Sequence, residues 1–176
     1  MREEVIMAGF GGQGIMFMGT VLAQAAMEEN KQVTFFPSYG AEMRGGIANC
    51  TVIISDEEIG SPVVAHPDTV IALNQQSTDK FSPRLKKEGL LIINSSLVSE
   101  EPGGEQIKKV KIEATKIAED LGDKRAANMA ALGAYIKEAK ILKLDALIKG
   151  LTHLLGEKKK SLLDINIKAL KKGYGV

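Results

Sequence analysis

The chain has 176 residues, enough for a substantial core, and residues 1–176 are expected to form a single domain. A net charge of +1 and an aromatic content of 5% argue against a nucleic-acid-binding protein. A single cysteine excludes a disulfide framework, an iron–sulfur cluster or a four-cysteine zinc site held by this chain alone.

No signal peptide or membrane-spanning segment is predicted. The start, Met1-Arg2-Glu3-Glu4, lacks a basic region followed by a long apolar stretch, and no apolar run approaches the roughly 20 residues that cross a membrane. We therefore expect a cytoplasmic protein without membrane contact. Residues 137–176 are rich in lysine, which predicts either a solvated helical face or a docking surface for an acidic partner.

The first predicted unit is a strand, a glycine loop and a helix. The strand covers residues 4–8, the loop is Gly9-Phe10-Gly11-Gly12-Gln13-Gly14, and the helix covers residues 15–29. The glycines at 9, 11 and 14 have the spacing G-x-G-x-x-G. Because glycine permits close backbone approach and a helix N-terminus offers unpaired N–H groups, this loop is a candidate cradle for a phosphate or carboxylate.

Strands and helices then alternate along the chain. Strands are predicted at 32–36, where Pro37 stops the strand, and at 47–54, 68–74, 89–94 and 110–114. Helices are predicted at 75–87, in a short segment ending at 121, and at 128–141, 144–155 and 160–172. An acidic turn at 55–58 with a return through 59–64 predicts an antiparallel hairpin. The pattern indicates an α/β fold, a Rossmann-like three-layer sandwich with a mostly parallel sheet, one antiparallel hairpin and a helical C-terminal part.

The glycine loop by itself leaves its role open. A dinucleotide site requires an acidic residue after the second strand, but that strand ends in Phe35-Phe36-Pro37-Ser38. No Gly-Lys-Ser/Thr follows the loop, so it is not a P-loop. A nucleotide site, a docking surface and a tight turn that serves only packing all remain open.

The second unusual stretch is Pro37-Ser38-Tyr39-Gly40-Ala41-Glu42-Met43-Arg44-Gly45-Gly46. It follows a predicted strand, and in an α/β sheet the loops at the carboxyl ends of the strands gather ligands and partners. Arg44 beside two glycines could present its guanidinium group to a carboxylate or phosphate, or pair locally with Glu42.

Other chemically capable residues favour structural roles. Cys50 lies in a predicted strand and is expected to be a small core residue. His66 and His153 have no ligand-forming residues at metal-site spacing, so no metal site is predicted. Asn128 precedes a helical stretch and is a candidate N-cap.

Three motifs together resemble the gamma subunit of 2-oxoacid:ferredoxin oxidoreductases. They are the run 9–14, the run 37–46, and Asn128-Met129 with Leu132-Gly133, and the resemblance covers nearly the whole chain. It implies an accessory subunit of a complex that oxidatively decarboxylates a 2-oxoacid to acyl-CoA and passes electrons to ferredoxin. The 2-oxoglutarate type is favoured because the chain is short. The isolated chain is expected to be inactive.

The resemblance also implies partners and site residues. The partners are the alpha, beta and, where present, delta subunits, which would hold thiamine diphosphate and the [4Fe–4S] clusters; ferredoxin is an indirect partner. The residues implied for contact with coenzyme A are Gly9, Gly11, Gly12, Gln13, Gly14 and Arg44. Those implied for the subunit interface are Tyr39, Gly40, Glu42, Arg44, Gly45, Gly46 and Asn128. Self-association of the isolated chain remains open, as do two other functions: a free-standing nucleotide-binding oxidoreductase domain and a purely structural scaffold.

Overall fold

The computed structural model describes residues 1–38, 46–102, 106–156 and 159–176. A six-stranded sheet has the order β2-β3-β1-β4-β5-β6. The strands are β1 (Arg2–Phe10), β2 (Gln32–Ser38), β3 (Ile47–Ser55), β4 (Thr69–Ala72), β5 (Leu90–Asn94) and β6 (Lys108–Ile112). The pairs β1–β4, β4–β5 and β5–β6 are parallel, whereas β3 is antiparallel to both β1 and β2. The predicted α/β fold with a mostly parallel sheet is confirmed.

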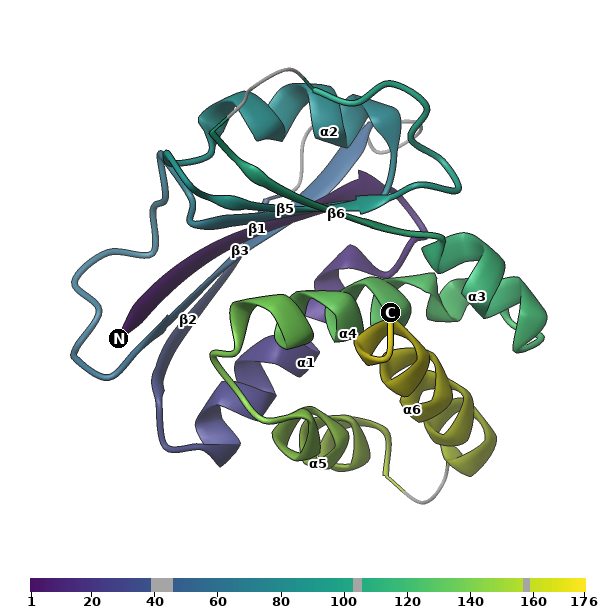
Figure 1. Ribbon diagram of the computed structural model, residues 1–176. Coiled ribbons are helices and arrows are strands. Elements are labelled where there is room, and N and C mark those ends of the chain that lie inside the picture. Colours follow the sequence, from purple (N-terminus) through teal and green to yellow (C-terminus); the bar gives the residue numbers. More distant parts are fainter. Residues whose placement is uncertain (39–45, 103–105, 157–158) are drawn as a thin grey trace.

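Helices cover both faces of the sheet (Figure 1). They are α1 (Ile15–Glu28), α2 (Gln75–Phe81), α3 (Ala114–Asp120), α4 (Ala127–Ala139), α5 (Leu144–Leu155) and α6 (Lys160–Tyr174), with 3-10 turns η1 (Ser82–Arg84) and η2 (Lys124–Ala126). Helix α2 lies on one face, and the other five helices lie on the opposite side. Among the described residues, no helix is long and apolar enough to cross a membrane.

Strand β1 is buried on both faces because its side chains alternate between two cores. Val5 and Met7 pack into the larger core with α1 and α4, while Ile6 and Ala8 pack into the smaller core beneath α2. A central strand between two helical layers therefore reads as a continuous apolar run rather than an alternating one. Strands β4 and β5, predicted to be buried from the same pattern, are fully buried here.

Two predicted details of the antiparallel part are wrong. Pro37 does not end the second strand: β2 continues to Ser38, with Pro37 opposite Cys50 of β3. The reason is that β2 is an edge strand, where a proline sacrifices no ladder hydrogen bond if its nitrogen faces outward. Residues 59–64 form no strand. The antiparallel hairpin is instead β2–β3, and its strand β3 also pairs with β1.

The helical C-terminal part is held by an unusually close crossing of α4 and α6. A methyl group at Gly133 would lie 2.1 Å from the carbonyl oxygen of Leu170, and one at Gly173 would lie 1.8 Å from that of Ala130. Only glycine lets the two backbones approach this closely. The crossing fixes the position of α6 relative to α4.

Candidate functional site

The glycine loop lies at the carboxyl end of β1, between β1 and α1. Gly12 and Gly14 have φ angles of 96° and 70°, which favour glycine. Gly14 occupies the N-cap position of α1, where no side chain caps the helix and no acidic residue stands in the first turn. The backbone N–H groups of this end are therefore available to an anion.

The glycines of the loop have different structural roles. A methyl group at Gly9 would lie 2.5 Å from Oε1 of Gln13, so this glycine makes room for the Gln13 side chain. Methyl groups at Gly11 and Gly12 would meet nothing among the described atoms, and both residues are exposed. The backbone of Gly11 and Gly12 is thus exposed and accessible to a ligand.

The Gln13 side chain braces the loop from within. Its Oε1 accepts hydrogen bonds from the backbone N–H of Phe10 at 2.6 Å and from Nδ2 of Asn74 at 3.3 Å. Its Nε2 donates to the carbonyl oxygen of Leu73 at 3.5 Å. With its amide engaged on both sides, Gln13 holds the shape of the loop, and its contact with a ligand stays a prediction.

Two buried asparagines continue this amide network along the carboxyl ends of β4 and β5. Asn74 accepts a hydrogen bond from the N–H of Ser77 and so caps α2. Nδ2 of Asn94 donates to the Leu73 carbonyl at 3.1 Å and to Oγ1 of Thr115 at 2.9 Å. Neither asparagine is predicted as a site residue from the sequence. The signal for them was available, since each of the two most apolar strands runs directly into an asparagine.

Asn128 links α4 to the glycine loop. It is not the N-cap of α4, a position taken by Ala126, so the predicted capping role is wrong. Instead its Nδ2 donates to the carbonyl oxygen of Gly14 at 3.0 Å, and its side chain is buried. A residue 114 positions away in sequence therefore holds the helix N-terminus in place.

A pocket of about 470 Å³ opens beside the loop. One wall comes from the loop, the start of α1, η2 and the start of α4, and the other comes from the end of α5 and the start of α6. The lining residues are Gly12, Gly14, Phe17, Asp123, Arg125, Ala126, Asn128, Leu154, Leu155, Lys159, Leu162 and Asn166. The pocket combines an apolar wall, two basic side chains and a helix N-terminus, which suits a ligand with both a phosphate and an apolar portion.

The electrostatics of the rim are set by Arg125. Its Nε lies 2.9 Å from Oδ1 of Asp123, and one terminal nitrogen lies 2.7 Å from Oδ2. This guanidinium group lowers the pKa of Asp123, so the pair is ionised at neutral pH. Because the Arg125 side chain is 78% exposed, it can exchange part of this pairing for a phosphate without a large desolvation penalty.

The ends of the second motif lie at the same edge of the sheet. Ser38 stands opposite Asn49, which pairs with Ala8, and Ile47, directly after Gly46, pairs with Phe10. The β2–β3 connection thus starts and finishes beside the glycine loop. The predicted site residues Tyr39, Gly40, Glu42, Arg44 and Gly45 lie outside the described residues.

Cys50 has no features of a nucleophile. It is buried beneath Gly19, its Sγ donates to the carbonyl oxygen of Ile15, and burial raises the pKa of the thiol to about 12. Within the described ranges, no group of three or more His, Cys, Asp or Glu side chains is placed to hold a metal ion.

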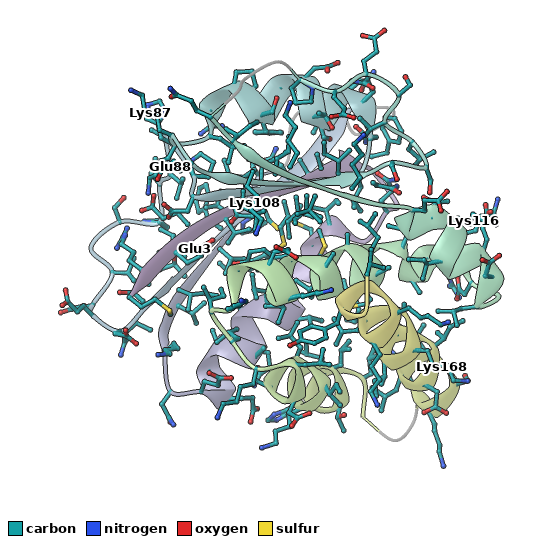
Figure 2. All side chains as sticks on the ribbon, in the orientation of Figure 1. Glu3, Lys87, Glu88, Lys108, Lys116 and Lys168 are labelled. Atoms are coloured by element: carbon teal, nitrogen blue, oxygen red, sulfur yellow. The ribbon has the colours of Figure 1, made fainter. Side chains whose placement is uncertain are left out.

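A second, charged cavity of about 300 Å³ lies at the opposite, amino-terminal edge of the strands. Figure 2 labels four of its lining residues, Glu3, Lys87, Glu88 and Lys108. Burial raises the pKa of Glu3, whose Oε1 accepts a hydrogen bond from Oγ1 of Thr69 at 2.7 Å. Both acidic and basic side chains line this cavity, so it favours neither an anionic nor a cationic ligand. The glycine-loop pocket therefore remains the candidate site.

Comparisons with known proteins identify a family and several relatives. Residues 4–176 match the family model described as pyruvate ferredoxin/flavodoxin oxidoreductase. The chain is 36% identical to the 2-oxoglutarate synthase subunit KorC of Methanocaldococcus jannaschii, over 100% of this chain and 94% of that protein. It is 37% identical to the ketoisovalerate oxidoreductase subunit VorA of Methanothermobacter marburgensis, over 97% of this chain. There it spans only 35% of the longer relative.

Two solved structures share the fold. The gamma subunit of a keto/oxoacid ferredoxin oxidoreductase from Geobacter sulfurreducens superposes with a TM-score of 0.89 at 32% identity, over 99% of this chain and 95% of that one. The second structure is a 2-oxoglutarate:ferredoxin oxidoreductase from Magnetococcus marinus, solved with 2-oxoglutarate, coenzyme A and succinyl-CoA bound. It superposes with a TM-score of 0.89. Its identity is 25%, over 99% of this chain and 30% of that one.

Proposed function

The chain belongs to the pyruvate ferredoxin/flavodoxin oxidoreductase family, and on this premise we propose that it is the gamma subunit of a multisubunit 2-oxoacid:ferredoxin oxidoreductase. The near-complete match to KorC and to the Geobacter sulfurreducens gamma subunit supports this role. Its partners would be the alpha, beta and, where present, delta subunits, with ferredoxin reached through them. The KorC relative favours 2-oxoglutarate as the substrate of the complex.

The redox and decarboxylation chemistry is assigned to the other subunits. A [4Fe–4S] cluster takes four cysteine thiolates, and this chain has one cysteine, whose thiol is buried and has a raised pKa. The donor set therefore does not fit a cluster. We assign thiamine diphosphate and the clusters to partner subunits, and binding and orientation to this chain.

The part that this chain contributes is contact with coenzyme A. The observation that carries the proposal is the pocket beside an uncapped helix N-terminus free of acidic first-turn residues. Coenzyme A carries phosphates at one end and a long, largely apolar arm ending in a thiol. The residues present fit both portions, since phosphates favour helix N-termini and basic side chains, and apolar chains favour leucine and phenylalanine walls.

Each wall of the pocket then has a function. Backbone N–H groups at Gly11, Gly12 and Gly14 would bind a phosphate, and Arg125 and Lys159 would neutralise its charge. Phe17 and the leucines of the α5–α6 wall would contact the apolar arm and direct its thiol toward the catalytic subunits. The role of Arg44, toward a phosphate or a partner carboxylate, stays a prediction from the sequence.

The first test is recovery of the complex. The tagged chain is purified under anaerobic conditions from its native host, and the eluate is assayed for 2-oxoacid-dependent dye reduction with coenzyme A. Thiamine- and cluster-binding partners with this activity are expected, and a panel of 2-oxoacids names the substrate. A chain recovered alone, without activity, contradicts the subunit role.

The second test separates coenzyme A binding from a scaffold role with two adjacent basic residues. Arg125 and Lys124 are similarly exposed, 78% and 74%, and each pairs with a nearby acid, but only Arg125 lines the pocket. Arg125→Ala in the assembled complex should raise the KM for coenzyme A by up to about tenfold, the loss of one charge-assisted contact. Lys124→Ala should leave it unchanged. A purely structural scaffold predicts no difference between the two variants.

The geometry gives no support to a free-standing nucleotide-binding domain. The parallel neighbour of β1 is β4, which leads into Leu73-Asn74 and carries no acidic residue for ribose hydroxyls. Calorimetric titration of the isolated chain with NAD and FAD should show no tight binding.

A further inference from the structure

The two edges of the sheet differ in how they are protected. Strand β6, at one edge, carries Lys108, Lys109 and Lys111 in a run of five residues. Figure 2 labels Lys108 among the charged side chains of that region. Strand β2, at the other edge, reads Gln-Val-Thr-Phe-Phe-Pro-Ser and carries no charge. Lysines on an edge strand discourage pairing with another chain, so β6 is protected and β2 is not.

The side chains of β2 are also incompletely covered. No residue of β2 is fully buried, in contrast to β1, β3, β4 and β5. Val33 and Phe35 pack against the larger core but remain partly exposed, and Phe36 on the other face is 49% exposed. Met27, near the end of the helix that leads into β2, is 55% exposed. An apolar, uncharged edge of this kind is the feature of a strand that pairs with another chain.

Pro37 indicates which backbone groups face the free edge. Proline is accommodated in an edge strand when its nitrogen points away from the neighbouring strand. Because strand geometry repeats every two residues, the N–H and C=O groups of Val33 and Phe35 then point the same way. Within the described residues, neither residue makes a backbone hydrogen bond outside the strand ladder. These groups form a short open ladder.

We infer that β2 pairs antiparallel with β2 of a second copy of this chain, about a two-fold axis at Phe35. In this register the two Phe35 residues exchange a reciprocal pair of backbone hydrogen bonds. Val33 N–H of each copy donates to Pro37 C=O of the other, and the missing proline N–H falls at the outer end of the ladder. The two sheets become one continuous sheet.

The strand sequence favours a second copy as the occupant. A two-fold axis places the same patch on both sides, so each side chain must tolerate its own kind nearby. Strand β2 satisfies this condition because it is uncharged, and its register sets Phe35 opposite Phe35 and Phe36 opposite Thr34, pairs that stabilise sheets. The same arrangement at β6 would bring lysines together. This contact lies apart from the coenzyme A pocket and goes beyond the proposed subunit role.

The test uses the full chain and two matched substitutions. Phe36→Lys places a charge on the free edge without touching the core, and Leu97→Lys makes the same change at a residue of similar exposure, 44%, after β5. Sedimentation velocity over a concentration series should show a dimer whose Kd rises at least tenfold in Phe36→Lys and is unchanged in Leu97→Lys. Far-UV circular dichroism confirms that both variants are folded.

Two further readouts identify the contact itself. Hydrogen exchange at the Val33 and Phe35 amides should slow as the concentration rises through the Kd. A chain with Thr34→Cys and Phe36→Cys should form a disulfide-linked dimer under mild oxidation, because these positions face each other in adjacent non-hydrogen-bonded sites.

Three results would overturn the inference. One is a monomer at every concentration, and another is a dimer that Phe36→Lys does not weaken. The third is a purified complex in which one copy of the chain is present and another subunit protects the two amides. None of these results depends on the 2-oxoacid assay, so a failure here is distinguishable from a failure of the proposed subunit role.

Discussion

The glycine loop provides its own controlled series of substitutions to alanine. At Gly11 the φ angle is not in the left-handed region and a methyl group would meet nothing. At Gly12 a methyl group would also meet nothing, but φ is 96°. At Gly14 φ is 70°, and a methyl group would lie 2.4 Å from Nδ2 of Asn128. Alanine should therefore cost almost nothing at Gly11. At Gly12 it should cost backbone strain alone, and at Gly14 it should cost both backbone strain and the contact with Asn128.

The expected magnitudes follow from these differences. Gly11→Ala should change the free energy of unfolding by less than about 0.5 kcal/mol. Gly12→Ala should cost about 1–2 kcal/mol, the penalty of a left-handed conformation in an L-residue. Gly14→Ala adds the loss of the bond from Asn128 to the Gly14 carbonyl, about 1–3 kcal/mol with a buried amide left unpaired. Its total is about 2–5 kcal/mol.

Urea unfolding followed by far-UV circular dichroism measures this series. With an m value of about 2 kcal/mol/M, Gly14→Ala should lower the midpoint by roughly 1–2.5 M. Combining Gly14→Ala with Asn128→Ala should cost less than the sum of the two, because the second change removes the atom that the methyl group meets. A Gly14→Ala cost no greater than that of Gly12→Ala, or strict additivity with Asn128→Ala, would refute the assigned role of Asn128.

Two further predictions concern the rest of the fold. Gly173→Ala should destabilise the chain by about 1–3 kcal/mol or more in the same assay, because its methyl group would lie 1.8 Å from the Ala130 carbonyl oxygen; Gly175→Ala, whose nearest atom is 3.5 Å away, is the neutral control. Hydrogen bonds from Lys31 and the N-terminal amine lower the pKa of Asp56 to about 2, so its stabilising contribution is present above the unfolded-state value near 3.8 and is lost as pH falls toward 2. The drop in Tm between pH 5 and pH 2.5 should therefore be smaller in Asp56→Asn than in the parent chain; equal drops would contradict the ion-pair assignment.

The order and kind of the elements could be predicted because they depend on neighbours in sequence. The predicted strands at 68–74 and 89–94 correspond to β4 and β5, and the predicted helix at 144–155 matches α5. The errors arose where sheet position mattered. Pro37 continues β2 because β2 is an edge strand, and residues 59–64 form no strand although their local pattern favoured a hairpin. Neither edge position nor strand partner is encoded by a window of adjacent residues.

The candidate site divides in the same way. The glycine loop and the uncapped start of α1 are encoded locally, because a left-handed turn and a helix end follow from the residues that form them. The contacts of Asn128 with Gly14, of Asn74 with Gln13 and of Asn94 with the Leu73 carbonyl, and the place of Arg125 and Lys159 in one pocket, depend on the tertiary fold. These contacts join segments far apart in sequence, such as Asn128 and Gly14, which are separated by 114 positions, so they form only once strand order and the close α4–α6 crossing bring the segments together.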